Sequence, residues 1–129
     1  MGNLEIKETK QTPYVYCDTV GIVKIEGRSF PNNSIDFFLP LVTWAKKFDG
    51  EFLTIHIKLE YFNTSTCKQL LSLLRIFMKN HKEKEVTVNW YYEEDDPDTL
   101  EIGQYYDIAV DAIFNFIEYN SDDKRVLTN

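Results

Sequence analysis

The chain has 129 residues, of which 43% are hydrophobic and 15% aromatic, and its formal net charge is −7. This composition supplies material for one buried core and excludes intrinsic disorder for the body of the chain. The negative charge and the absence of a long Lys or Arg run argue against nucleic acid as a partner, because a phosphate backbone would be repelled.

The lack of a recognisable targeting signal, together with the cysteine usage, predicts a cytoplasmic protein. No basic region followed by an apolar stretch opens the sequence, and no apolar run reaches the roughly 18 residues of a membrane span. Cys17 and Cys67 lie far apart without metal-ligand spacing, which is typical of reduced, mostly buried thiols. We therefore expect no membrane insertion, no metal and no cofactor.

The first quarter of the chain predicts three short strands. β-like runs cover residues 4–9, 14–17 and 20–26, separated by turn residues at 11–13 and 18–19. Tight connections of this kind favour antiparallel pairing at the start of the sheet.

The hydrophobic period then changes to that of a helix ending at Asp49-Gly50. Ser34 is the expected N-cap. Pro40 lies inside the pattern, where it should bend the helix, unless the regular helix begins at Pro40 itself. The predicted buried stripe is Ile35, Phe38, Val42, Ala45 and Phe48, flanked by Leu39 and Leu41.

Residues 52–62 form the clearest strand, because apolar and polar side chains alternate along it. Such alternation predicts a sheet with helices on one face and water on at least part of the other. The predicted inner side chains are Leu53, Ile55, Ile57, Leu59 and Tyr61, and the outer ones are Thr54, His56, Lys58 and Glu60.

The remaining chain alternates between helices and strands. Residues 63–66 open a second helix, 85–92 form a strand, Pro97 begins a third helix and 113–119 form the last strand. The order β-β-β-α-β-α-β-α-β predicts a single α/β domain over residues 1–119, with a mixed sheet and right-handed crossovers, followed by a polar tail at 120–129. The predicted buried stripes are Cys67, Leu70, Leu71, Leu74, Phe77, Met78 and His81 in the second helix, and Leu100, Ile102, Tyr105, Tyr106, Ile108 and Ala109 in the third.

Enzyme motifs are absent from the sequence. It contains no GxGxxG, Walker loop, GxSxG or HExxH pattern. The two histidines, His56 and His81, lie on a polar strand face and at a helix end, where structural or solvated roles are favoured. We therefore predict a protein without catalytic residues.

Five carboxylates in six residues form an acidic loop at residues 93–98. A magnesium or calcium site there would lack the alternating ligands and central Gly of a calcium loop, so a solvated loop next to a helix N-terminus is the favoured interpretation. A small metal-dependent hydrolase using this loop remains an alternative. A recognition surface for a basic partner is a third interpretation, with Trp90, Tyr91, Tyr92, Asp95 and Asp96 as its residues.

The segment from Tyr61 to Lys68 carries three successive hydroxyls, Thr64, Ser65 and Thr66, at a strand-to-helix turn. Simple capping by Asn63 or Thr64 would explain such residues. A phosphoacceptor is the functional interpretation, because the helix dipole favours a phosphate in the first turn and Lys68 could add a charge pair.

Three motifs in register resemble the SiaC family of regulatory phosphoproteins. They are residues 61–66 (Tyr-Phe-Asn-Thr-Ser-Thr), residues 27–33 leading into 37–40, and residues 88–96 (Val-Asn-Trp-Tyr-Tyr-Glu-Glu-Asp-Asp). The resemblance runs from about residue 20 to 118. It implies a fold similar to the STAS domains of anti-sigma-factor antagonists.

The resemblance also implies a phosphorylation switch. In the family, a dedicated kinase phosphorylates the threonine of the Asn-Thr-Ser motif, a PP2C-type phosphatase removes the phosphate, and the unphosphorylated form can bind and activate a diguanylate cyclase. Carried over by motif, the acceptor is Thr64, flanked on the partner surface by Tyr61, Asn63, Ser65, Thr66 and Lys68. Thr66-Cys67 departs from the more usual Ser-Ser or Ser-aliphatic pair. Ser65 and Thr66 are then neighbouring hydroxyls that could be mistaken for the acceptor but do not displace Thr64. A constitutive adaptor in which Thr64 only caps the helix is the alternative.

Overall fold

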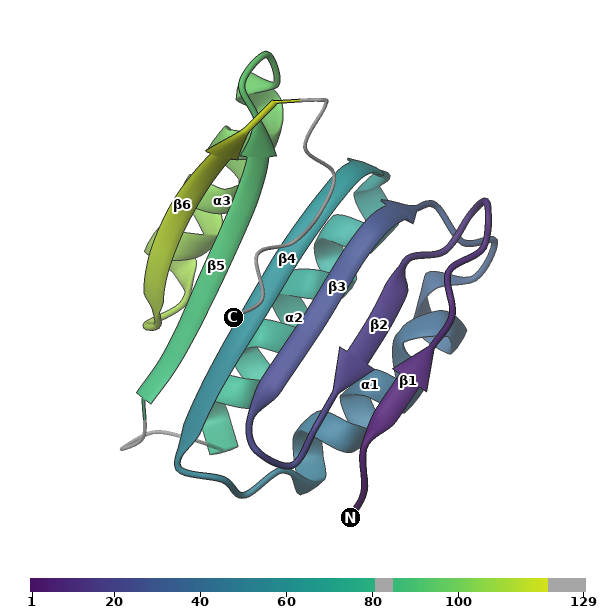
Figure 1. Cartoon of the computed structure of the whole chain (residues 1–129), viewed down its shortest axis with the longest axis vertical. Coiled ribbons are helices and arrows are strands. Elements are labelled where there is room, and N and C mark those ends of the chain that lie inside the picture. The colour runs from purple at the N-terminus through teal and green to yellow at the C-terminus, as the bar shows by residue number, and fades with distance from the viewer. Residues whose placement is uncertain (81–84, 121–129) are drawn as a thin grey trace.

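The computed structural model describes residues 1–80 and 85–120, which form one six-stranded mixed sheet and three helices (Figure 1). The elements follow the predicted order, so the predicted fold class is confirmed. They are β1 (Leu4–Ile6), β2 (Tyr14–Cys17), β3 (Ile22–Ser29), α1 (Ser34–Lys47), β4 (Phe52–Phe62), α2 (Thr64–Asn80), β5 (Glu85–Glu93), α3 (Pro97–Ala109) and β6 (Ile113–Tyr119).

The strands lie in the sheet in the same order as in the chain. β1, β2 and β3 pair antiparallel, whereas β3, β4, β5 and β6 pair parallel. Each parallel step passes through one helix and moves to the next position in the same direction. Right-handed crossovers then place every helix on the same face, and Figure 1 shows all three helices behind the sheet.

The core lies between this face and the helices. Val23, Ile55 and Val88 form one register row across the sheet, and Ile25, Ile57 and Trp90 form the next. All six side chains are buried. The helices cover them with Phe38, Leu41, Trp44, Ala45, Leu70, Leu73, Leu74, Phe77 and Tyr106.

The opposite sheet face carries the outer side chains of β4. Thr54 and His56 are half-buried and Glu60 is exposed, as predicted. The prediction that Lys58 is accessible is wrong, because Lys58 is only 4% exposed and its ammonium lies 4.5 Å from the centre of the Tyr119 ring. An aromatic ring face attracts a cation and shields it from water.

Several strand, helix and cap boundaries differ from the predicted ones, and β3 continues to Ser29, beyond its predicted end at residue 26. β1 ends at Ile6, and β3 begins at Ile22 after Gly21, whose φ of +113° is strained for other residues. The N-cap of α1 is Asn33, whose side chain accepts a hydrogen bond from the Asp36 N–H at 3.1 Å, so Ser34 is the first helical residue. The helix continues through Pro40.

The predicted helix stripes are partly wrong. Ile35 and Leu39 are exposed and Leu41 is in the core. In α2, Thr66 and Leu73 are buried although neither was predicted, whereas Cys67, Leu71 and Met78 are half-buried. His81 lies outside the described residues.

In α3, Tyr105 and Ile108 are 58% and 87% exposed, while the buried residues are Thr99, Gly103 and Tyr106. The cause is the close approach of α3 to Trp90, since a Cβ on Gly103 would lie 2.6 Å from the indole ring. Within the described residues, no helix is long and apolar enough to cross a membrane.

Candidate functional site

The turn between β4 and α2 is organised by Asn63. Its side-chain oxygen accepts hydrogen bonds from the Thr66 N–H at 3.0 Å and from the Ser65 hydroxyl at 3.1 Å. Its main-chain carbonyl accepts the Cys67 N–H. Asn63 is therefore the N-cap of α2, which resolves the alternative between Asn63 and Thr64.

The three hydroxyls of this turn occupy different environments. Thr66 is fully buried, and its hydroxyl lies 2.8 Å from the Ser29 hydroxyl and donates to the Ser29 carbonyl at 3.1 Å. Ser65 is half-buried and bonded to Asn63. Thr64 is exposed, and its hydroxyl has no hydrogen bond within the described residues. Thr64 is the hydroxyl that a second protein can reach.

The end of β3 holds the turn in place. The Ser29 carbonyl accepts both the Asn63 N–H, at 3.1 Å, and the Thr66 hydroxyl. Neither contact involves the Thr64 hydroxyl, so this anchor does not depend on it. Ser29 lies in one of the motifs on which the family resemblance rests, although the sequence pattern alone does not mark it as a site residue.

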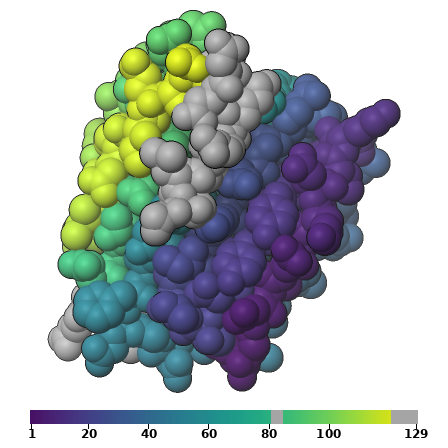
Figure 2. Space-filling view, in the orientation of Figure 1, coloured from purple at the N-terminus to yellow at the C-terminus, as the bar shows by residue number. Residues whose placement is uncertain are grey.

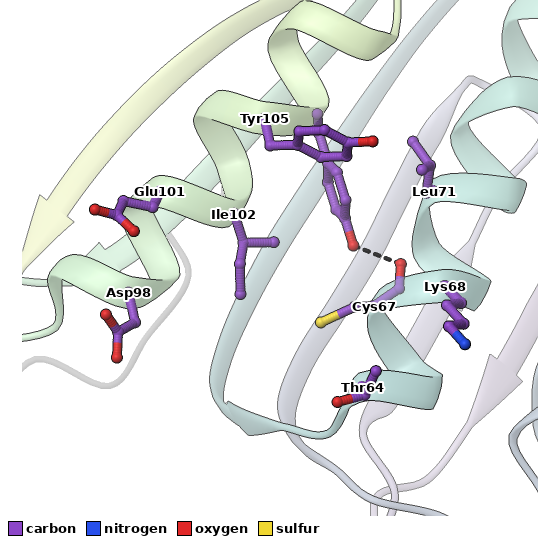
Figure 3. A pocket seen from close by; sticks show the side chains of 9 residues that line it. Thr64, Cys67, Lys68, Leu71, Asp98, Glu101, Ile102 and Tyr105 are labelled. Carbon is purple, nitrogen blue, oxygen red and sulfur yellow. Dashed lines mark hydrogen bonds between the residues drawn. The ribbon is translucent and has the colours of Figure 1, made fainter.

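A groove of about 560 Å³ runs between α2 and α3, with Thr64 at one end (Figure 3). The hydrophobic period places its apolar lining in the predicted buried stripes of the two helices, and no sequence signal distinguishes this lining from the core. The lining residues are Thr64, Cys67, Lys68 and Leu71 from α2, and Asp98, Glu101, Ile102, Tyr105 and Tyr106 from α3.

Charged side chains lie on both walls of this groove, and a hydrogen bond joins the two walls. Lys68 is exposed on the α2 side, while Asp98 and Glu101 are exposed on the α3 side. The Tyr106 hydroxyl donates to the Cys67 carbonyl at 2.5 Å, which joins the two walls (Figure 3). Burial raises the pKa of Tyr106, so this hydroxyl keeps its proton.

Cys67 lies beside Thr64 but is not activated as a nucleophile. Burial raises the pKa of its thiol above the ordinary value, and the partly opposing influence of the Tyr106 contact is smaller. A thiolate is needed for nucleophilic chemistry or metal binding. The residue therefore serves as a small apolar side chain in the groove wall.

The residues of the predicted recognition surface around the acidic loop differ widely in exposure. Trp90 and Tyr91 are buried, at 1% and 3% exposed, while Tyr92 is half-buried and Asp95 is exposed, so these residues do not form one surface. Asp96 caps α3 by accepting the Thr99 N–H at 3.1 Å and the Thr99 hydroxyl at 2.7 Å. Among the described residues, no group of three or more His, Cys, Asp or Glu side chains is arranged to hold a metal ion.

Fold and site together define an α/β domain that presents one free threonine hydroxyl at a strand-to-helix turn, beside an apolar groove. The family model for the SiaC family regulatory phosphoproteins matches residues 6–119. The chain belongs to the SiaC family of regulatory phosphoproteins, which confirms the resemblance seen in its motifs.

Proteins of Pseudomonas aeruginosa are similar to this chain in sequence and structure. An uncharacterized protein of strain UCBPP-PA14 is 28% identical over 111 residues, which cover 82% of this chain and 88% of that protein. The crystal structure of apo-SiaC superimposes with a TM-score of 0.82 at 27% identity, covering 91% of this chain and 99% of that one. A chain in the crystal structure of the diguanylate cyclase SiaD in complex with its activator SiaC gives a TM-score of 0.83 at 26% identity, covering 90% and 99%.

Proposed function

We propose that this protein is a cytoplasmic, non-enzymatic regulator whose binding to a downstream effector is switched by phosphorylation of Thr64. A protein kinase adds the phosphate, and a PP2C-type phosphatase removes it. The unphosphorylated form binds and activates the effector, which we propose to be a diguanylate cyclase. The observation that carries this proposal is that Thr64 alone of the three turn hydroxyls is exposed and unbonded among the described residues.

The position of Thr64 suits a phosphate. As the first residue of α2, it lies at the positive end of the helix dipole, where backbone N–H groups can donate hydrogen bonds to an anion. Lys68 follows one turn later and lines the same groove. The anchor through Ser29, Asn63 and Thr66 does not use the Thr64 hydroxyl. We therefore expect the fold to survive phosphorylation.

The same phosphate would oppose docking in the groove. It adds nearly two negative charges at the end of an apolar channel that already has Asp98 and Glu101 on its opposite wall. A partner that covers the groove must desolvate that charge or leave the groove, and a buried unpaired charge is strongly unfavourable. The groove is thus the surface on which the phosphate has its greatest effect.

The choice of effector follows from the relatives. The P. aeruginosa structure is described as a diguanylate cyclase with its activator SiaC. This chain shares the fold of P. aeruginosa SiaC over 91% of its length. A cyclase effector is therefore the partner class that the comparisons support for this chain.

Mass spectrometry of the protein purified from its native host tests the acceptor. The peptide containing residues 64–66 should carry phosphate on Thr64 in the wild type and in the matched control Ser65→Ala. Thr64→Ala should carry none, yet it should still co-purify with the cyclase. Full phosphorylation of the Thr64→Ala protein would contradict the assignment of the acceptor. Co-purification with a metal-dependent hydrolase activity instead of with a cyclase would contradict the proposed function.

A further inference from the structure

The outer edge of β6 carries unused main-chain hydrogen-bonding groups. β6 is the last strand of the sheet, and Figure 2 shows it along the rim of the molecule. The Tyr119 carbonyl accepts the Glu94 N–H, so Tyr119 and, by alternation, the other odd-numbered residues of β6 direct their main-chain groups toward β5. The even-numbered residues Phe114, Phe116 and Glu118 therefore direct theirs outward, and no described residue bonds to them there.

This edge lacks the features that keep sheet edges from pairing. β6 has seven residues, without Pro, Gly or a register shift, and its one charge is Glu118. Edge strands are usually protected by shortness, Lys, Pro or bulges. β1, at the other edge, has only three residues. The sequence Ile-Phe-Asn-Phe-Ile-Glu-Tyr of β6 has strong strand propensity, and Ile113 is 52% exposed.

We propose that two copies of this chain pair through their β6 strands, antiparallel, about a two-fold axis at Phe116. Phe116 then lies opposite Phe116 of the second copy, and Phe114 lies opposite Glu118. All three outward-directed residues fall in hydrogen-bonded positions, and each opposing pair exchanges two main-chain hydrogen bonds. The six-stranded sheet becomes one continuous sheet across the dimer.

The side chains favour a second copy as the occupant. Phe114 and Phe116 stack with ring centres 6.0 Å apart on the helix-covered face of β6, so the two-fold axis places the two Phe116 rings side by side and joins the two stacks into one group of four aromatic rings. The two Glu118 carboxylates lie on opposite sides of the axis, each opposite a Phe, so no like charges face each other. An isologous contact of this kind closes on itself and does not propagate.

The dimer should be weak and should respond to salt. The contact is one strand wide, which places it at the low end of interface sizes. Each copy also carries a net charge of −7, so the two copies repel each other at long range. Salt screens this repulsion beyond about 10 Å at 0.1 M. Raising the salt concentration should therefore strengthen the association.

Sedimentation equilibrium of the full chain between about 10 µM and 1 mM, a range chosen for a weak contact, tests the pairing. The average mass of the wild type and of Glu118→Ala should rise from one chain toward two, more steeply at higher salt. Glu118→Pro should stay a monomer, because it removes an outward N–H without touching the bonds to β5, and Pro is tolerated at an edge. Glu118→Ala is the matched control, since it loses the same Tyr92 contact.

Amide hydrogen exchange on the wild type tests the register without any variant. With increasing concentration, exchange should slow at the amides of Phe114, Phe116 and Glu118, while those of Asn115 and Ile117 are already protected by β5. A protein that is monomeric throughout, or a dimer that leaves these three amides unprotected, would overturn the proposal. Protection that appears only when another protein is added would show that β6 pairs with that partner and not with itself.

Discussion

The Tyr106 hydroxyl and the Cys67 carbonyl are hydrogen-bonded at 2.5 Å, which ties α3 to the first turns of α2. Tyr106 also packs edge-on against Trp90, with ring centres 5.4 Å apart. Trp90 in turn donates to the Thr99 carbonyl at 3.0 Å. The two walls of the groove beside Thr64 are thus fixed to each other and to the core.

Replacing Tyr106 with Phe should loosen the groove without unfolding the domain. The change removes one buried hydrogen bond and should cost about 0.5–1.5 kcal/mol of unfolding free energy, as is typical of such bonds. Urea denaturation measures this loss. Tyr105→Phe is the matched control, because Tyr105 is exposed and should change stability by less than about 0.5 kcal/mol. Equal stability of both variants would show that the bond to Cys67 does not hold α3.

Thr66→Val should destabilise the turn between β4 and α2 while leaving the proposed phosphorylation of Thr64 in place. Val keeps the shape of Thr but leaves the buried Ser29 hydroxyl without its partner, at a cost of about 1–3 kcal/mol. Ser29→Ala combined with Thr66→Val should cost less than the sum of the single changes, since both polar groups are then absent. Additive losses in a urea double-mutant cycle would mean that the two hydroxyls do not interact. Loss of the Thr64 phosphate in Thr66→Val would mean that phosphorylation depends on the Thr66 hydroxyl.

The domain should lose stability as the pH falls below neutrality, in part because of His56. Burial, and then the nearby Lys24 charge, lower the pKa of His56 below its ordinary value of 6.5. The unfolded chain therefore binds more protons near pH 6 than the folded one does. The contribution of neutral His56 is complete above about pH 6.5 and declines as the pH falls toward the folded-state pKa.

His56→Gln isolates this contribution, because every other group titrates equally in both proteins. The unfolding free energy of the variant should fall less between pH 7.5 and 5.5 than that of the wild type. The Asn89 side-chain amide lies 3.4 Å from the His56 Nδ1, consistent with a neutral ring that accepts a hydrogen bond there. Parallel pH profiles of the two proteins would refute a role for His56.

The sequence predicts strand positions better than helix faces, for a physical reason. Period-two alternation predicts the bounds of β4, residues 52–62, because helices cover one face of the sheet. It is wrong about two side chains, since Lys58 is buried and Tyr61, predicted to face inward, is exposed. Tyr105 and Tyr106 are alike in the sequence, yet only Tyr106 is buried. Their difference depends on how closely Gly103 lets α3 approach Trp90, which is a tertiary contact.

The candidate site around Thr64 likewise has features that the sequence predicts and features that depend on tertiary contacts. The run Asn-Thr-Ser-Thr locates the strand-to-helix turn that carries Thr64, because these residues favour helix starts. The run does not reveal which hydroxyl is accessible. That depends on Ser29, 37 residues before Thr66, whose hydroxyl and carbonyl draw Thr66 into the interior. The groove between α2 and α3 likewise arises only when two separate helices pack side by side.

Isothermal titration of the native host's diguanylate cyclase with this protein, fully phosphorylated on Thr64 or fully dephosphorylated, tests the central claim most directly. The dephosphorylated form should bind, and phosphorylation should weaken binding by about a hundredfold or more, equivalent to about 2.7 kcal/mol. Thr64→Asp should lie between the two, because a carboxylate carries one charge and lacks the third oxygen. Circular dichroism should be the same for all forms, since an anion is tolerated at this helix end. Equal affinity of the two forms, or loss of α2 helicity on phosphorylation, would contradict the account.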